Sequence, residues 1–362
     1  MFDDAVLDDP SGLTEADTEG LLLSAARAGA QVRSTSEAAA ARGLDDALGS
    51  QPRALVLLAR PGVAPAIHRL LAALAGPSCP VPVIRTDATP SWIGPLDVVL
   101  AHADDPADPE LAASIDRAGR YGATVVLTAP DEGPVAAAAA GNALLVPPVV
   151  DVPAGLAAAR VLTAGLLALR ALGLLDPDVD ALADELDREA ERDHLVHESF
   201  VNPAKSLALR VADRTPLLWG LDPVATAAAG HAAQVLGEFA GTVCDVADYQ
   251  QARARTALHR AAVRGGSEAD LFADPELDGP VGGRRVMLLA VRPGHTADAM
   301  RRLAENAVPN ADVLAPSAEV AEELAGDEAT CAAVLALRFE LAALYLGLAT
   351  GNVGAALRSG QR

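Results

Sequence analysis

Short apolar runs alternate with longer helical stretches along the first half of the chain. Each run holds four to six residues and is rich in Val, Leu and Ala; the runs span residues 54–59, 81–85, 97–101, 124–128 and 143–146. Continuous apolar runs are typical of parallel strands that helices cover on both faces. The pattern therefore predicts an α/β fold built on a parallel sheet.

The same pattern restarts after two long helical stretches in the middle of the chain. These stretches cover residues 156–175 and 178–206, and Pro177 breaks the helical pattern between them. New apolar runs follow at 216–220, 242–244, 285–291 and 311–315, and an apolar helix is predicted at 331–348. We expect two α/β lobes, each built on a parallel sheet and joined by helices.

The length of the chain predicts its number of domains, and its net charge argues against one class of partner. A chain of 362 residues is too long for one ordinary core and long enough for two domains. Its formal net charge is −21, with 49 acidic residues against 28 basic ones and no basic run. Nucleic-acid binders carry a basic face, so we expect no nucleic-acid partner.

Cysteine spacing and the apolar segments predict a cytoplasmic protein. Cys79, Cys244 and Cys331 form no CxxC pair, which favours a reducing compartment. The first four residues include two aspartates where a secretory signal would be basic. The longest apolar run, 155–175, contains two arginines, so it predicts a buried helix and no contact with a membrane.

Candidate chemistry lies on the loops at the carboxyl ends of the predicted strands, where open parallel sheets bind ligands. Arg60 and Arg85 each leave the end of a strand, which makes them candidate anion-binding residues. Asp104, Asp105 and Asp108 share another such loop. Closely spaced acids can bind Mg²⁺, but such a run is more often a solvated turn, and we expect no metal site.

Several short motifs occur in the order found in a known family. They are Val81-Pro82-Val83-Ile84-Arg85, Pro90-Ser91-Trp92, Asn202-Pro203-Ala204-Lys205-Ser206-Leu207-Ala208, Gln234-Val235-Leu236-Gly237-Glu238 and Leu344-Tyr345-Leu346. In this order the sequence resembles the bifunctional phosphoglucose/phosphomannose isomerase family, which is built from two sugar-isomerase (SIS) domains. The resemblance covers residues 55–348.

The resemblance implies a fold and a division of the chain. It predicts two SIS-type domains, each a parallel five-stranded sheet flanked by helices. We expect an N-terminal helical segment at 1–50, a first SIS-like domain at 51–155, connecting helices at 156–206 and a second SIS-like domain at 207–362. The family precedent and the apolar last helix also predict a homodimer, and no cofactor is expected.

The phosphate loop of that family is altered in this chain. The family's hydroxyl-rich run S-x-S-G-N-T-E-E corresponds here to residues 103–110, which read ADDPADPE. Three aspartates repel a phosphate dianion, and two prolines remove backbone donors. The family's Gly-rich turn is reduced to a single glycine. The candidate substrate-binding residues are Arg60, Gly62, Arg85, Asp105 and Asp108.

Aldose–ketose isomerisation moves a proton between adjacent carbons and therefore needs a general base. The resemblance implies Glu238 as this base, because it falls on the family's glutamate position. His259 is the histidine nearest to the family's ring-opening residue, and a gap is needed to align it. We take Glu238 and His259 as the catalytic candidates. On its Ala-rich helix, Glu238 is also typical of a solvated surface acid.

The sequence leaves three functions open. The first is a SIS-domain protein that binds a sugar phosphate or a related carbohydrate derivative, with weak or lost isomerase activity. The second is an active phosphoglucose/phosphomannose isomerase with a rebuilt site, acting on glucose 6-phosphate and mannose 6-phosphate. The third is a non-enzymatic interaction protein. The altered loop favours the first or the third, and the resemblance supports the second.

Overall fold

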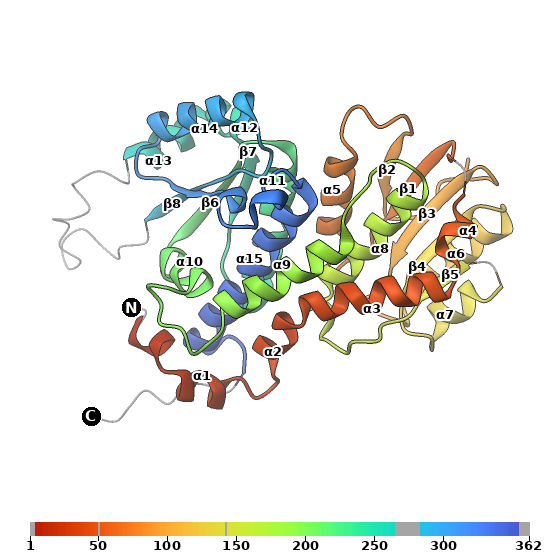
Figure 1. The fold of residues 1–362 in the computed structure, drawn as a ribbon, viewed down its shortest axis with the longest axis horizontal. Helices are drawn as coiled ribbons and strands as arrows, with labels where there is room; N and C mark the ends of the chain where they lie inside the picture. Colours follow the sequence, from red (N-terminus) through yellow and green to blue (C-terminus); the bar gives the residue numbers. More distant parts are fainter. Residues whose placement is uncertain (1–3, 50, 142, 265–282, 355–362) are drawn as a thin grey trace. The chain divides into compact units, whose positions relative to one another are not determined.

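The chain forms two compact units, each with its own parallel sheet (Figure 1). The computed structural model describes residues 4–49, 51–141, 143–264 and 283–354. The first unit comprises Arg27–Asp184, and the second unit comprises Met1–Ala26 together with Glu185–Arg362.

The first unit is built on five parallel strands in the order β2-β1-β3-β4-β5. The strands are β1 (Ala54–Leu58), β2 (Val83–Thr86), β3 (Asp97–His102), β4 (Thr124–Thr128) and β5 (Ala143–Val146). Every residue of β1 and β3 is buried, as expected for central strands of a covered parallel sheet. All five strands lie where the apolar runs predict them.

Helices cover both faces of this first sheet. On one face, α5 (Ala64–Ala75) packs against α8 (Ala158–Ala171), and α3 (Ala28–Ala41) packs along α8. On the other face, α6 (Pro109–Arg120) and α7 (Pro134–Ala139) pack together over a core that contains Val99, Ile115 and Leu127. The short helices α4 (Leu44–Ala47) and η2 (Ala154–Leu156) complete the unit.

The second unit is built on a four-stranded parallel sheet in the order β7-β6-β8-β9. Its strands are β6 (Thr215–Gly220), β7 (Asp245–Asp248), β8 (Arg284–Leu289) and β9 (Asp312–Leu314). The prediction of five strands is therefore wrong for the described part of this sheet. The strand predicted at 242–244 lies at β7 instead. Gly241 and Thr242 still belong to the end of the preceding helix, because the Thr242 amide donates to the carbonyl of Leu236 at 3.0 Å.

Helices also lie on both faces of the second sheet (Figure 1). One face carries α12 (Tyr249–Ala254), α13 (Thr256–Arg264) and α14 (His295–Ala307), which pack over Trp219 and Leu288. The other face carries α11 (Pro223–Ala240), which packs against α15 (Glu328–Thr350). In its described part this unit also contains the C-terminal part of α9 (Val179–Arg192) and the elements η1 (Asp4–Asp8), α1 (Pro10–Ala16), α2 (Leu21–Ala26), α10 (Pro203–Val211), η4 (Pro316–Ala318) and η5 (Glu322–Leu324).

The helix α15 is apolar, and its residues 329–348 are buried. Among the described residues it alone is long and apolar enough to cross a membrane, yet its most apolar window is 100% buried. Such burial is what the core helix of a soluble protein shows. The apolar run at 155–175 likewise forms the buried helix that its sequence predicts, α8.

The stretch predicted as helical from 178 to 206 is interrupted. The helix α9 (Val179–Arg192) ends before Asp193, whose carboxylate accepts a hydrogen bond from the Ala204 amide at 2.8 Å. The side chain of Asn202 then caps α10 by accepting from the Lys205 amide at 2.8 Å, with Pro203 as the first helical residue. Both side-chain bonds are accepted from amides in the first turn of α10, so they fix where this helix begins.

The predicted type of fold, parallel sheets flanked by helices, is confirmed in both units. The domain boundaries at residues 50, 155 and 206 stay predictions.

Candidate functional site

The first sheet has a switch point between β1 and β3. β1 leads to β2 on one side of the sheet, whereas β3 leads to β4 and β5 on the other. Open α/β sheets bind ligands at such a point, next to the carboxyl ends of the strands. The loops after Leu58 and His102 are therefore the place to look for a site in this unit.

The side chain of Asp104 lies across this switch point. Its Oδ2 accepts a hydrogen bond from the Val63 amide, in the loop after β1, at 2.9 Å, and its Oδ1 lies 3.0 Å from His102 Nε2. Gly62 has a φ of +121°, and a Cβ on it would lie 1.8 Å from Asp104 Oδ2. Only glycine fits this backbone with the carboxylate beside it. Asp104 thus ties the loop after β1 to the end of β3.

His102 connects this carboxylate to the next strand. It is the last residue of β3 and pairs in register with Thr128, the last residue of β4. Its side chain is 1% exposed, and its Nδ1 lies 2.8 Å from the Thr128 hydroxyl. A neutral imidazole that donates from Nε2 to Asp104 accepts at Nδ1 from that hydroxyl. The three side chains form a polar network, with Asp104 as its most exposed member.

Arg160, on α8, supplies a positive charge near the network. Burial lowers the pKa of its guanidinium, while the carboxylates of Asp104 and Asp151 act in the opposite direction. Asp104 therefore contributes to balancing a partly buried cation, as a bound anion would.

Arg60 is held by two acids of the neighbouring loop. Its Nε lies 2.7 Å from Asp108 Oδ2 and its Nη1 lies 2.7 Å from Glu110 Oε2. The hydrogen bond to Asp108 raises the pKa of Arg60. Burial acts to raise the pKa of Asp108, but hydrogen bonds from Arg60 and from the amides of Leu111 and Glu110 outweigh it and lower that pKa. The arginine and the acid proposed for substrate binding are thus paired with each other.

Arg85 and Asp105 lie apart from these contacts. Arg85 is exposed on β2, at the edge of the sheet. Asp105 is also exposed, and its Oδ1 accepts from the Ala107 amide at 2.8 Å, as in a solvated turn. In residues 4–49, 51–141, 143–264 and 283–354, no group of three His, Cys, Asp or Glu side chains is arranged to hold a metal ion.

The two catalytic candidates lie on different faces of the second sheet. Glu238 is exposed on α11, where Gln234 Nε2 lies 3.5 Å from its Oε2. His259 lies on α13 and stacks on Trp219, with ring centroids 5.7 Å apart. Burial, and then Arg253, lower the pKa of His259. Within this unit the structure does not bring Glu238 and His259 together.

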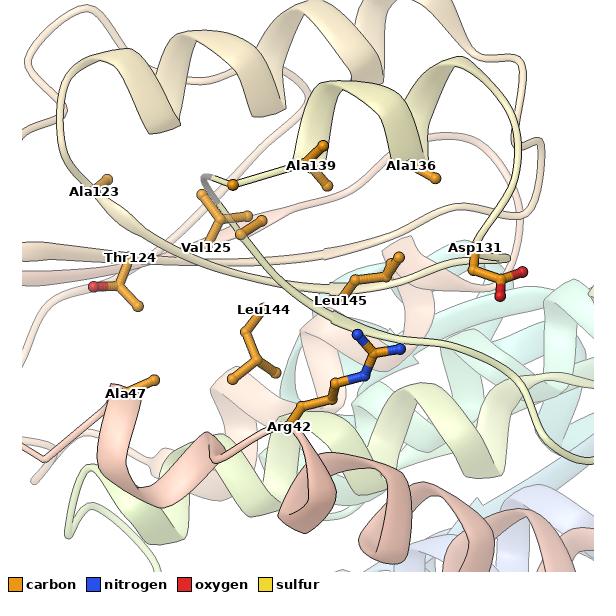
Figure 2. A pocket seen from close by; sticks show the side chains of 13 residues that line it. Arg42, Ala47, Ala123, Thr124, Val125, Asp131, Ala136, Ala139, Leu144 and Leu145 are labelled. Atoms are coloured by element: carbon orange, nitrogen blue, oxygen red, sulfur yellow. The ribbon is translucent and has the colours of Figure 1, made fainter.

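An open groove of about 870 Å³ lies beside the edge strand β5 in the first unit. Figure 2 shows Leu144 of β5 on the side of Arg42 and Ala47, Leu145 on the opposite side of the strand, and Asp131 at one end. Most of the other lining residues are alanines. This lining offers apolar contact, and its two charged side chains have opposite signs.

The polar network was not among the site residues that the sequence proposes. His102 and Thr128 end their strands, and Arg160 lies on a helix that reads as purely apolar packing. Polar residues at the carboxyl ends of neighbouring buried strands were the available signal, because these ends meet at one edge of a parallel sheet. Asp104 was noticed only as one member of an acidic run.

Several solved structures are similar to this chain over nearly its whole length. No protein-family model matches the sequence, and no curated protein does. Among solved structures, tagatose-6-phosphate ketose/aldose isomerase from Escherichia coli is similar at a TM-score of 0.62 and 12% identity, over 97% of this chain and 99% of that one. The C-terminal domain of glucosamine-fructose-6-phosphate aminotransferase from Francisella tularensis is similar at 0.58 and 10%, over 94% and 100%. A hypothetical protein from Thermus thermophilus is similar at 0.64 and 15%, over 98% and 91%.

These similarities establish the fold. The chain shares the fold of these solved structures along nearly its whole length, and this agrees with the SIS-type fold expected from the sequence. At identities of 10 to 15% they carry no residue roles. The closer assignment to the phosphoglucose/phosphomannose isomerase family stays a prediction.

Proposed function

We propose that this chain binds a phosphorylated sugar, or a related carbohydrate derivative, with little or no isomerase turnover. The binding half is supported by the fold, since similar solved structures include a tagatose-6-phosphate isomerase and several proteins described as phosphosugar isomerases. Glucose 6-phosphate and mannose 6-phosphate are the first ligands to test, because the motifs resemble the family that acts on them.

One observation carries the loss of turnover: the Asp104 carboxylate at the switch point. This carboxylate accepts a hydrogen bond from the Val63 amide, and its negative charge helps to balance the positive charge of Arg160. Asp108 and Glu110 occupy the guanidinium of Arg60 in the same way. A phosphate dianion arriving here would meet carboxylates on the donors it needs, and like charges at close range repel.

The test is a binding and turnover experiment on the whole chain. A coupled assay with fructose 6-phosphate, glucose 6-phosphate and mannose 6-phosphate should detect no isomerisation by the wild-type protein. In calorimetry, Asp104→Ser should bind glucose 6-phosphate about tenfold or more tightly than wild type, because it frees one amide donor and leaves Arg160 for the anion.

Asp105→Ser is the matched control. It removes the same charge one residue away, and its carboxylate bonds only within its own turn, to the Ala107 amide. An equal gain in both variants would mean that net charge, and not occupation of the switch point, limits binding. Wild-type turnover that Glu238→Gln abolishes would contradict the proposal and favour an active isomerase with Glu238 as its base.

A further inference from the structure

The second sheet has a switch point of the same kind, and there a cavity is open. β6 lies between β7 and β8, and a cavity of about 280 Å³ lies at the carboxyl ends of β6, β8 and β9. Its polar lining consists of Asp222 from the loop after β6, Arg292 from the loop after β8, Asp298 and Arg301 from α14, and Ser317 from the segment after β9.

Like Asp104 at the first switch point, Asp222 accepts hydrogen bonds from backbone amides of a neighbouring loop. Its Oδ1 accepts from the Ala225 amide at 2.8 Å, and its Oδ2 accepts from the amides of Val291 at 2.8 Å and Arg292 at 3.1 Å. Three amide donors therefore offset the charge of this carboxylate. Space for a ligand remains beside it.

The two arginines of the cavity are held differently. Arg292 Nε pairs with Glu328 Oε2 at 2.9 Å, which is the length of a charge-assisted hydrogen bond. Arg301 lies 3.5 Å from Asp298 Oδ1 and 3.9 Å from Glu305 Oε1, both on its own helix and both beyond that length. The guanidinium of Arg301 thus keeps hydrogen-bonding capacity toward the cavity, and one third of its side chain is exposed.

The lining matches a small ligand that carries both hydroxyl groups and an anionic group. A guanidinium and a serine hydroxyl donate to phosphate oxygens, while a carboxylate such as Asp298 accepts from sugar hydroxyls. The cavity volume lies just below the range of sites for drug-sized molecules, which suits a monosaccharide phosphate.

We propose that this cavity in the second unit is the sugar-phosphate site, with Arg301 binding the phosphate. This inference rests on the proposed function, because it names the place where the ligand binds. It places the phosphate at Arg301 in the second unit, beside a cavity of about 280 Å³, and not at Arg60 or Arg85 in the first unit.

The experiment is calorimetry on the full chain at constant ionic strength, with fructose 6-phosphate, fructose and inorganic phosphate as probes. Arg301→Ala should weaken fructose 6-phosphate binding about tenfold or more, since a hydrogen bond to a charged group is lost. Arg302→Ala is the matched control, because it removes the same charge from the next, exposed residue of α14 outside the cavity lining. Ser317→Asp is a second variant, which places a repelling charge in the cavity and should also weaken binding. Thermal unfolding checks that each variant is folded.

The outcomes separate this inference from the proposed function. Fructose 6-phosphate binding that is weakened by Arg301→Ala and Ser317→Asp but not by Arg302→Ala supports both. Binding that none of these variants changes overturns the location and leaves the function standing, whether or not Arg60→Ala weakens it. If inorganic phosphate binds as tightly as fructose 6-phosphate and loses this affinity in Arg301→Ala, the result supports an anion site at Arg301. That result contradicts the claim that the ligand is a carbohydrate. If the wild-type protein binds none of these probes and neither glucose 6-phosphate nor mannose 6-phosphate, both are overturned.

Discussion

Burial sets the chemistry of His68, a residue of α5 in the first unit. Its side chain is buried, and its Nδ1 has no hydrogen-bond partner within the described part of the chain. Burial, with smaller contributions from the charges of His102 and Arg85, lowers its pKa from 6.5 to about 3. The folded protein therefore keeps this imidazole neutral at any pH at which it is expected to work.

The low pKa of His68 predicts a stability that declines in acid. Below pH 6.5 the unfolded chain takes up a proton that the folded chain accepts only near pH 3, so the free energy of unfolding falls as the pH falls through this window. The slope is at most about 1.4 kcal/mol per pH unit. Guanidinium titrations between pH 4 and 7 should show a shallower decline for His68→Leu than for wild type.

A change in stability at pH 7 caused by His68→Leu does not affect this test, because the measured quantity is the slope of the free energy of unfolding against pH. His197→Leu is the control, since its side chain is 38% exposed and its replacement should leave the decline unchanged. An unaltered slope in His68→Leu would show that other groups cause the acid sensitivity.

At the scale of elements, α11 and α15 approach each other closely at Gly347. A Cβ at this position would lie 2.2 Å from the carbonyl oxygen of Phe239 on α11. The two helices pack along each other in the core of the second unit, so the distance between them affects the packing of this core.

Gly347→Ala should therefore lower the free energy of unfolding by about 1–3 kcal/mol, because the added methyl group forces the helices apart. The measurement is chemical denaturation followed by circular dichroism. Gly237→Ala, on α11, is the control: the nearest heavy atom to its Cβ would be 4.0 Å away. That substitution should raise stability by about 0.5–1 kcal/mol through helix propensity. Equal effects in both variants would contradict the close approach.

The elements of the first sheet could be predicted because each strand is a continuous apolar run between breaks. The second sheet was predicted less well, since β7 begins with Asp245 and carries few apolar residues. The interruption at 193–202 was missed because its cause, side-chain caps formed by Asp193 and Asn202, depends on contacts and not on composition. The polar network at the first switch point was missed for the same reason, since strand register alone brings His102 beside Thr128.

At the scale of the whole molecule, the net charge of −21 opposes association of two chains. The homodimer expected from the sequence stays a prediction. The connection between α9 and α10 exposes three apolar side chains at which it can be tested: Val196 is 57% exposed, Phe200 79% and Val201 56%. Contact between copies through this segment would bury apolar area against a long-range repulsion.

We therefore expect the dimer to become tighter as salt screens the repulsion, with a screening length of about 10 Å at 0.1 M. Sedimentation velocity at 0.05 and 0.5 M NaCl measures this change. Phe200→Ser should reduce the dimer fraction, whereas Val243→Ser, at a residue that is 80% exposed elsewhere in the unit, should not. A monomer at both salt concentrations would contradict the expected dimer.

The contact between Asp104 and Val63 means that the first switch point carries a tethered competitor. A ligand fixed to the chain by a few bonds acts at an effective concentration on the order of millimolar or above, however dilute the solution. Any incoming anion must displace this carboxylate. The competition weakens the apparent affinity of the anion, and the weakening grows with the effective concentration of the carboxylate and with its own affinity for the site. An anion that binds at this switch point would therefore do so only above a threshold concentration, which the carboxylate of Asp104 sets.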